Sequence, residues 1–169
     1  MARTDRRWCV ALLLVCCVVL ATAGCAAARP PARAAPVAAG PSRPVTAARY
    51  LAIAEDGNDR LEIDFDRLAG RDRDRLGAAR ADLRDAAATE RRFDRRLLAI
   101  MFPAVTERIA RLLFQVNQSR ASLTISAATS VSLRQLGSVE RRLSAANVPV
   151  EEAVRVIRSQ LGLPPPDTS

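Results

Sequence analysis

The chain has 169 residues, with 26 arginine and lysine residues against 18 aspartate and glutamate residues, and its formal net charge is +8. It contains no histidine, and its four cysteines all lie within the first 25 residues. The rest of the chain therefore cannot assemble a serine–histidine or cysteine–histidine nucleophilic site, and it lacks the usual ligands of zinc, copper and di-iron centres. We expect no cofactor and no metal ion.

The first 24 residues have the pattern of a secretory signal peptide. Residues 1–7 are polar and basic, residues 8–20 form an unbroken apolar run, and small residues follow it. This run is shorter than the roughly 20 residues that a spanning helix needs, although the alanines after it keep an uncleaved anchor open as an alternative. We predict cleavage and export, and Arg6 and Arg7 leave open whether the general or the twin-arginine route is used.

Cys25 stands directly after these small residues. The segment Thr22-Ala23-Gly24-Cys25 resembles the bacterial lipobox, in which the leader is cut before a cysteine that carries diacylglycerol, although the motif most often has leucine in place of Thr22. No cysteine follows Cys25, so it cannot form a disulfide within the mature chain. We predict a lipoprotein that acyl chains such as palmitate on Cys25 anchor to the outer face of the cell membrane. The alternative is cleavage by ordinary signal peptidase after Ala23 and secretion of the free chain.

Beyond the leader the sequence predicts a linker, four helices and a tail. Residues 25–44 and 163–169 are rich in proline and have no hydrophobic period, so we expect a disordered linker and a disordered tail. Between them apolar residues recur at three- and four-residue steps, which is the period of one helix face. We predict helices over residues 45–69, 71–101, 103–126 and 129–161. Short links between four amphipathic helices predict an all-α, antiparallel up-down four-helix bundle, with a kink near Pro149.

Three polar residues stand where this period expects an apolar one, namely Asn58, Glu90 and Ser119. If the first two helices fold back on each other near Gly70, Glu90 falls beside Tyr50. We expect these four residues to form a buried polar layer that fixes the register of the helices, as single buried asparagines do in coiled coils. A small ligand pocket between the helices is the alternative.

Several short stretches are similar to ones in a known group of proteins. They are Tyr50-Leu51 with the nearby Asn58, the segment Phe93-Asp94-Arg95-Arg96-Leu97-Leu98, the helix start at Pro103, and Leu161-Gly162-Leu163-Pro164-Pro165. With these stretches the chain resembles a family of Ala-rich, all-helical actinobacterial secreted lipoproteins. The resemblance covers roughly residues 48–165. It implies a helical, exported protein, and it supplies no catalytic or binding residue because no function is assigned to that family.

The charge pattern and the missing chemistry lead to three functional hypotheses. Basic and acidic residues alternate, as in residues 71–75, rather than forming a basic stripe, and an exported protein is separated from the genome, so we expect no nucleic-acid partner. The first hypothesis is a non-enzymatic, lipid-anchored module that contacts the membrane or another envelope protein. The second is a carrier or sensor of a small apolar ligand, held beside the small seam residues Ala54, Ala79, Ala86 and Ala146. A carboxylate-based hydrolase is the third and weakest.

Overall fold

The computed structural model describes residues 41–166, and all of their regular structure is α-helical. The four helices are α1 (Arg43–Ala69), α2 (Leu76–Leu98), α3 (Ala104–Ala128) and α4 (Leu133–Leu161). The predicted all-α four-helix bundle is confirmed. The leader, Cys25, the linker as far as residue 40 and residues 167–169 lie outside the described part.

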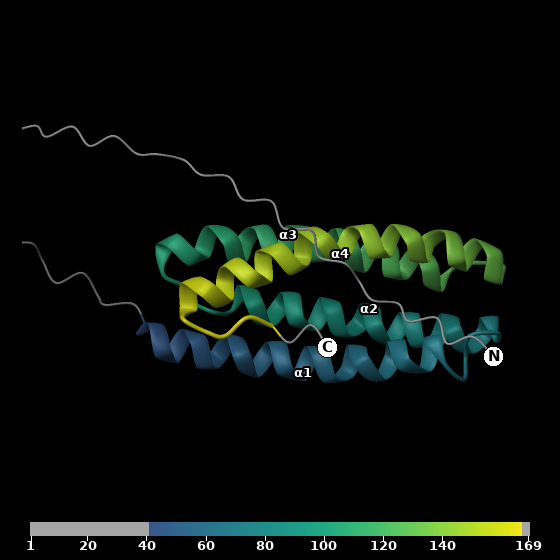
Figure 1. The fold of residues 1–169 in the computed structure, drawn as a ribbon, viewed down its shortest axis with the longest axis horizontal. Coiled ribbons are helices and arrows are strands. Elements are labelled where there is room, and N and C mark those ends of the chain that lie inside the picture. The colour runs from purple at the N-terminus through teal and green to yellow at the C-terminus, as the bar shows by residue number, and fades with distance from the viewer. Residues whose placement is uncertain (1–40, 167–169) are drawn as a thin grey trace, which may run out of the picture. The chain divides into compact units, whose positions relative to one another are not determined.

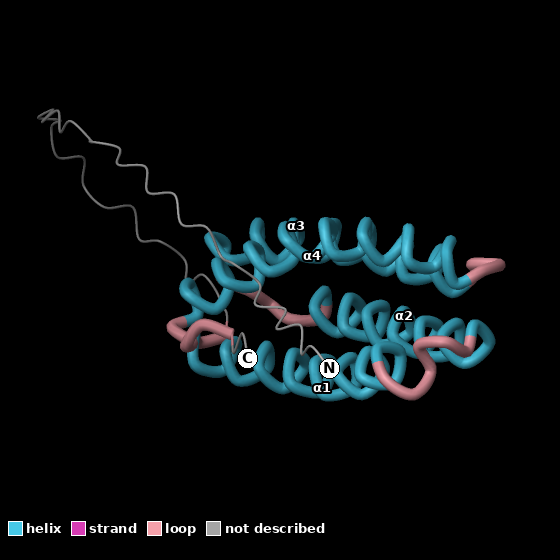
Figure 2. Tube along the Cα trace, turned by 45° about the vertical axis from the view of Figure 1, so that its right-hand side comes forward, coloured by secondary structure: helices cyan, strands magenta, loops and turns pink. Residues whose placement is uncertain are grey.

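Each helix packs along the next one in the chain, and short links make successive helices antiparallel (Figure 1). The pairs α1–α2, α2–α3 and α3–α4 make extensive contacts, whereas α1 and α4 meet only sparsely. Figure 2 shows the same order of helices from a second direction, with α1 beside α2 and α3 beside α4. The bundle is therefore held together mainly by neighbours in sequence, and α2 and α3 form its central pair.

Two of the helices begin later than the sequence predicts. Residues 71–75 form a turn and not the first turn of α2, because the buried carboxylate of Asp72 accepts hydrogen bonds from Arg71 and Arg75 (3.0 and 3.4 Å) and holds the chain there. Helix α4 begins at Leu133 and not at residue 129, because the side chain of Ser132 caps it by accepting a hydrogen bond from the Gln135 amide at 3.2 Å.

The proline positions explain where α1 and α3 begin. Pro44 lies in the first turn of α1 and Pro103 directly precedes α3, where a missing amide proton costs nothing. Pro149 lies inside α4, which continues through it as one helix. The last part of α4, in yellow in Figure 1, slants away from the line of its first part, as the predicted kink requires. Gly162 ends α4 with a positive φ of 73°, a backbone conformation that favours glycine.

The buried apolar residues form two clusters. The first, which we name the linker-end core, lies where α1 and α3 begin and α2 and α4 end, and it contains Ala47, Tyr50, Ile53, Leu97, Ala110, Leu113, Val150, Ala153, Ile157 and Leu161. The second, the far-end core, lies at the opposite ends of the helices and contains Leu68, Ala79, Leu83, Ala127, Ala128, Leu136 and Val139. Burial of these side chains stabilises the bundle at both ends.

The start of the predicted tail is packed onto the bundle. Leu163 packs against the linker-end core, and the Arg158 guanidinium donates a hydrogen bond to the carbonyl oxygen of Pro164 at 2.6 Å. The prediction of disorder from residue 163 is therefore wrong for residues 163–166. Within the described part of the chain, no helix is long and apolar enough to cross a membrane.

Candidate functional site

A group of polar side chains lies between α2 and α3. Glu90 and Asp94 stand four residues apart on α2, and Asn117, Arg120 and Thr124 follow one another at three- and four-residue steps on α3. These spacings place each set on one helix face, so the two faces meet. We name these five residues the polar layer.

Glu90 is the most deeply buried charged member, with 1% of its surface exposed. One carboxylate oxygen accepts hydrogen bonds from the Arg120 guanidinium (2.8 Å) and the Thr124 hydroxyl (3.3 Å). The other oxygen is buried without a hydrogen-bond partner among the described residues. Burial raises the pKa of Glu90, and the charge of Arg120 opposes that rise.

Asp94 is the second buried carboxyl group. Its oxygen accepts a hydrogen bond from the Asn117 side-chain amide at 2.8 Å, and the same amide donates to the backbone oxygen of Glu90 at 3.4 Å. Burial raises the pKa of Asp94 to about 6, against the lowering effect of that hydrogen bond. Asp94 is therefore mostly ionised at pH 7 and about half protonated near pH 6.

The structure places the four predicted polar residues differently. Glu90 and Tyr50 are buried, but Tyr50 belongs to the linker-end core, where its ring meets Phe102 edge-on with 6.5 Å between the ring centres. The prediction for Asn58 and Ser119 is wrong, because both are exposed.

Neighbouring residues take the inward positions instead. On α1 the buried residue is Gly57, and a Cβ there would make an ordinary van der Waals contact with the Phe93 ring at 3.8 Å. Asn58, one residue further, points roughly 100° away around the helix. On α3 the buried residue is Asn117, and Ser119 bonds to its own helix through the Gln115 carbonyl oxygen at 3.2 Å. The feature of the sequence that could have predicted the polar layer is a polar stripe on α3. It consists of Asn117, Arg120 and Thr124, and it faces Glu90.

The Tyr50 hydroxyl is buried without a hydrogen-bond partner among the described residues, and burial raises its pKa to about 12, with the nearby charge of Arg158 opposing. Tyr50→Phe removes only this oxygen. Because an unpaired buried hydroxyl is costly, we expect the variant to keep its stability or gain up to about 1 kcal/mol in free energy of unfolding, measured by urea titration. A loss of about 1 kcal/mol or more would show that the hydroxyl has a bonding partner and that this placement is wrong.

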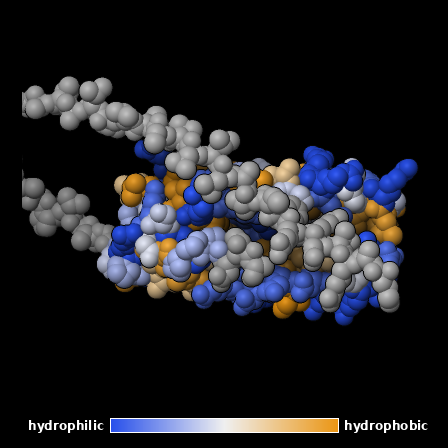
Figure 3. Space-filling view, viewed as in Figure 1, coloured by the Kyte–Doolittle hydropathy of each residue, from blue (hydrophilic) through white to orange (hydrophobic). Residues whose placement is uncertain are grey.

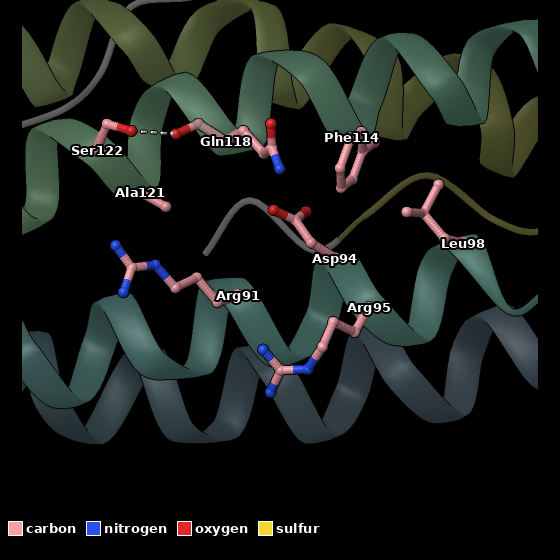
Figure 4. Close-up of a pocket in the computed structure, with 8 residues that line it drawn as sticks. All are labelled: Arg91, Asp94, Arg95, Leu98, Phe114, Gln118, Ala121 and Ser122. Atoms are coloured by element: carbon pink, nitrogen blue, oxygen red, sulfur yellow. Dashed lines mark hydrogen bonds between the residues drawn. The ribbon is translucent and has the colours of Figure 1, made fainter.

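A surface groove of about 450 Å³ runs along the α2–α3 contact beside the polar layer (Figure 4). We name it the α2–α3 groove, and its lining residues are Arg91, Asp94, Arg95, Leu98, Phe114, Gln118, Ala121 and Ser122. Figure 4 shows the Asp94 carboxylate pointing from α2 toward α3, with Phe114 and Gln118 on the opposite side. Neither Arg91 nor Arg95 forms an ion pair with another described residue. The groove therefore combines two free cationic groups with an aromatic ring and an aliphatic side chain.

A second groove, of about 310 Å³, lies between α1 and α2. Its charged residues are Arg60, Asp64, Asp85 and Arg92, two of each sign, so it offers no excess charge to a ligand. The α2–α3 groove is lined by two arginines and a single carboxyl group, so it has an excess of positive charge and is the better candidate for a binding site. In Figure 4, Arg91 extends toward α3, whereas Arg95 extends along the other side of α2.

Of the two carboxyl groups in the polar layer, only Asp94 lines the groove. Glu90 lies beneath the surface with one oxygen committed to Arg120 and Thr124. Within residues 41–166, no group of three or more acidic, cysteine or histidine side chains is arranged to hold a metal ion. The arrangement is suited to binding an anionic group beside an apolar one, since guanidinium groups pair with carboxylates and Phe114 and Leu98 supply apolar contact.

Comparison of the chain with protein-family models, with curated proteins and with solved structures found no match.

Proposed function

We propose that the protein is a non-enzymatic interaction module, held at the outer face of the cell membrane by lipid on Cys25. In this proposal the α2–α3 groove binds a segment of another envelope protein. The observation that supports it most directly is the composition of the groove, where the unpaired Arg91 and Arg95 stand beside Leu98 and Phe114. Arginine and aromatic residues are enriched at protein interfaces, because each combines a large contact area with directional polar groups.

The same residues define the chemistry of the partner segment. The two guanidinium groups favour a segment that carries carboxylates, and the apolar residues favour Leu- or Phe-type side chains beside them. An acidic amphipathic helix, laid along the groove, meets both requirements. Asp94 would oppose an acidic ligand when ionised, so we expect tighter binding as pH falls from 7 to 5, because the pKa of Asp94 is about 6.

The carboxyl groups support a binding role more than a catalytic one. A glycosidase needs two carboxyl groups that flank one bond of the substrate. Here Asp94 lines the groove, whereas Glu90 is buried and paired with Arg120. Raised pKa values also arise in buried polar networks of this kind without any catalysis.

The alternative hypothesis, an apolar-ligand carrier, has less support. The middle of the bundle holds the charged and polar side chains of the polar layer, which an apolar ligand would leave unsolvated. Ala79 and Ala86 are almost fully buried, and neither lines either of the two grooves. We interpret these small residues as positions where helices approach each other closely.

Photo-crosslinking from inside the groove tests the proposal. A photoreactive amino acid replaces Gln118 in the full-length chain, in cells that export the protein. As a control, the same amino acid replaces Val131 in the α3–α4 connection, at the far end of the bundle. We expect the photoreactive residue at position 118 to form an adduct with one protein. This adduct should disappear when Arg91→Gln and Arg95→Gln are added, and it should remain when Arg84→Gln and Arg92→Gln are added. The second pair removes the same charge from the same helix but does not line the groove.

Three outcomes would overturn the partner role. The first is an adduct from position 118 that survives Arg91→Gln/Arg95→Gln, and the second is an equally strong adduct from position 131. The third is the absence of any adduct from position 118.

A further inference from the structure

Four of the nine large apolar side chains that are exposed in the described part of the chain lie at the linker end of the bundle, where α1 and α3 begin and α2 and α4 end, and two, Val131 and Leu133, lie at the opposite end. The four at the linker end are Val45 (46% exposed), Leu98 (56%), Met101 (64%) and Val105 (68%). Met101 lies in the α2–α3 connection, and Val105 lies in the first turn of α3. Leu98 is the last residue of α2, and Val45 lies in the first turn of α1. Side chains of this kind lose no hydrogen bond when they leave water, so an apolar environment beside this end would stabilise it.

The same end carries most of the excess positive charge. Residues 41–53, 94–113 and 150–166, which span the linker-end core, contain eight arginines and four carboxyl groups, one of them the buried Asp94. The opposite end, residues 63–83 and 121–140, contains six arginines and six carboxyl groups. Three of the linker-end arginines, Arg49, Arg95 and Arg108, are exposed and form no ion pair with described residues. Figure 3 shows hydrophobic and strongly hydrophilic residues side by side at the left-hand end, where α1 begins.

The chain also reaches this end first. Residues 26–42 separate the lipid-bearing Cys25 of the proposed function from Arg43, the first residue of α1. At roughly 3 Å per residue, such a segment spans on the order of 50 Å at most. Lipid on Cys25, at the start of this segment, would therefore keep the linker end of the bundle at high local concentration next to lipid headgroups. The far end of the bundle would be held less closely.

We propose that the linker end of the bundle docks on the anionic phospholipid surface, with Met101 and Val105 entering the headgroup region and Arg49 and Arg108 contacting phosphates. This docking rests on the proposed lipid anchor, and it adds the orientation of the bundle relative to the membrane. A combination of exposed apolar side chains with flanking arginines is typical of segments that lie in the membrane interface, where neither the apolar nor the cationic part suffices alone. The α2–α3 groove begins at Leu98 on this end and extends along α2 away from the membrane.

Fluorescence quenching on the lipidated protein tests this orientation. The mature chain has no cysteine other than Cys25, so an environment-sensitive dye attached through Val105→Cys or Val131→Cys reports on one end of the helices at a time. Val131 is 81% exposed and lies at the opposite end, which makes it the matched control. Both labelled proteins are reconstituted into vesicles of phosphatidylcholine with phosphatidylglycerol, and into vesicles of phosphatidylcholine alone. Mass spectrometry of each preparation reads the lipid on Cys25 independently.

In the anionic vesicles we expect quenching by aqueous iodide to fall at least about threefold for the dye at position 105 and to stay unchanged at position 131. High salt, neutral vesicles or an Arg49→Gln/Arg108→Gln background should restore most of the quenching, since these conditions remove the attraction to anionic lipid. Equal quenching at both positions in anionic vesicles would overturn the docking while leaving lipidation and the groove untouched. Protection of the dye at position 105 from iodide in the exported Cys25→Ala protein, without vesicles, would also overturn the docking on lipid. In that case a second copy of the protein would cover this end of the bundle. If Cys25 carried no lipid, the anchor in the proposed function would be wrong. The docking would still be tested by whether anionic vesicles protect the dye at position 105 from iodide.

Discussion

Asp94→Asn is expected to raise the free energy of unfolding at pH 7 by about 2 kcal/mol. Burial raises the pKa of Asp94 from 3.8 to about 6, so ionisation of this group destabilises the folded protein at neutral pH. A shift of that size is equivalent to about 3 kcal/mol, and we expect less because Asp94 borders an open groove. Asparagine has the same shape and can still accept the hydrogen bond from Asn117.

The sign of the pH dependence follows from the direction of the shift. Because the pKa is higher in the folded state than in the unfolded state, the folded protein binds this proton more tightly. The stabilisation is complete below about pH 4 and is lost as pH rises through about 6. The wild type should therefore gain stability between pH 7 and pH 5, and Asp94→Asn should gain less. Glu90 contributes in the same direction, so the difference between the two proteins is the quantity to measure.

Urea titrations at several pH values check this prediction. Asp74→Asn, on the exposed turn before α2, is the control for removing one carboxylate, and it should change the free energy of unfolding by no more than about 0.5 kcal/mol. A variant Asp94→Asn that is less stable than wild type at pH 7, or that keeps the full wild-type slope, would contradict the placement of Asp94.

Arg120→Ala is expected to lower the free energy of unfolding by about 3 kcal/mol. The side chain of Arg120 is only 14% exposed and that of Glu90 1%, so removing the guanidinium leaves a buried carboxylate with only the Thr124 hydroxyl as a partner. Breaking a buried pair from one side costs roughly 3–5 kcal/mol, and Glu90 can limit the loss by taking up a proton. The loss should therefore be larger at pH 8 than at pH 5.

A double substitution separates the ion pair from the packing around it. Replacing both residues with apolar ones of similar size, as in Glu90→Leu/Arg120→Met, removes the buried charge together with its partner. Such replacements are often neutral or stabilising, so the double variant should recover most of the stability that Arg120→Ala loses. If Arg120→Ala cost less than about 1 kcal/mol at pH 8, Glu90 would be solvated and the polar layer would not exist as described.

The fold followed from the sequence because each helix buries one apolar face. Positions such as Leu83, Leu97 and Ile157 recur at the helix period and are buried in the two cores. The helix starts were less predictable, since they depend on individual side chains. The buried Asp72 holds the turn before α2 and the Ser132 cap sets the start of α4, and neither feature alters the apolar period.

The polar layer was predictable only in part. Glu90 stood out because a charged residue interrupted an apolar face, whereas on α3 the helix period was assigned to the face of Ser119 and the structure buries Asn117 instead. On α1 the inward position belongs to Gly57, which has no side chain to mark it as apolar, and Asn58 was assigned in its place. The α2–α3 groove depends on how far α3 is shifted along α2, and that shift is set by contacts such as Glu90–Arg120 and Asp94–Asn117.

In the proposed function, lipid on Cys25 holds this bundle at the membrane, and fractionation of cells that produce the full-length chain tests this anchoring most directly. Wild type and Cys25→Ala are compared after a high-salt wash, which removes proteins bound only through charge. We predict that the wild type stays with the membranes and carries diacylglycerol, and that Cys25→Ala appears in the soluble extracytoplasmic fraction with the same helical content. Retention of both proteins on the membranes, or release of both, would contradict anchoring through Cys25.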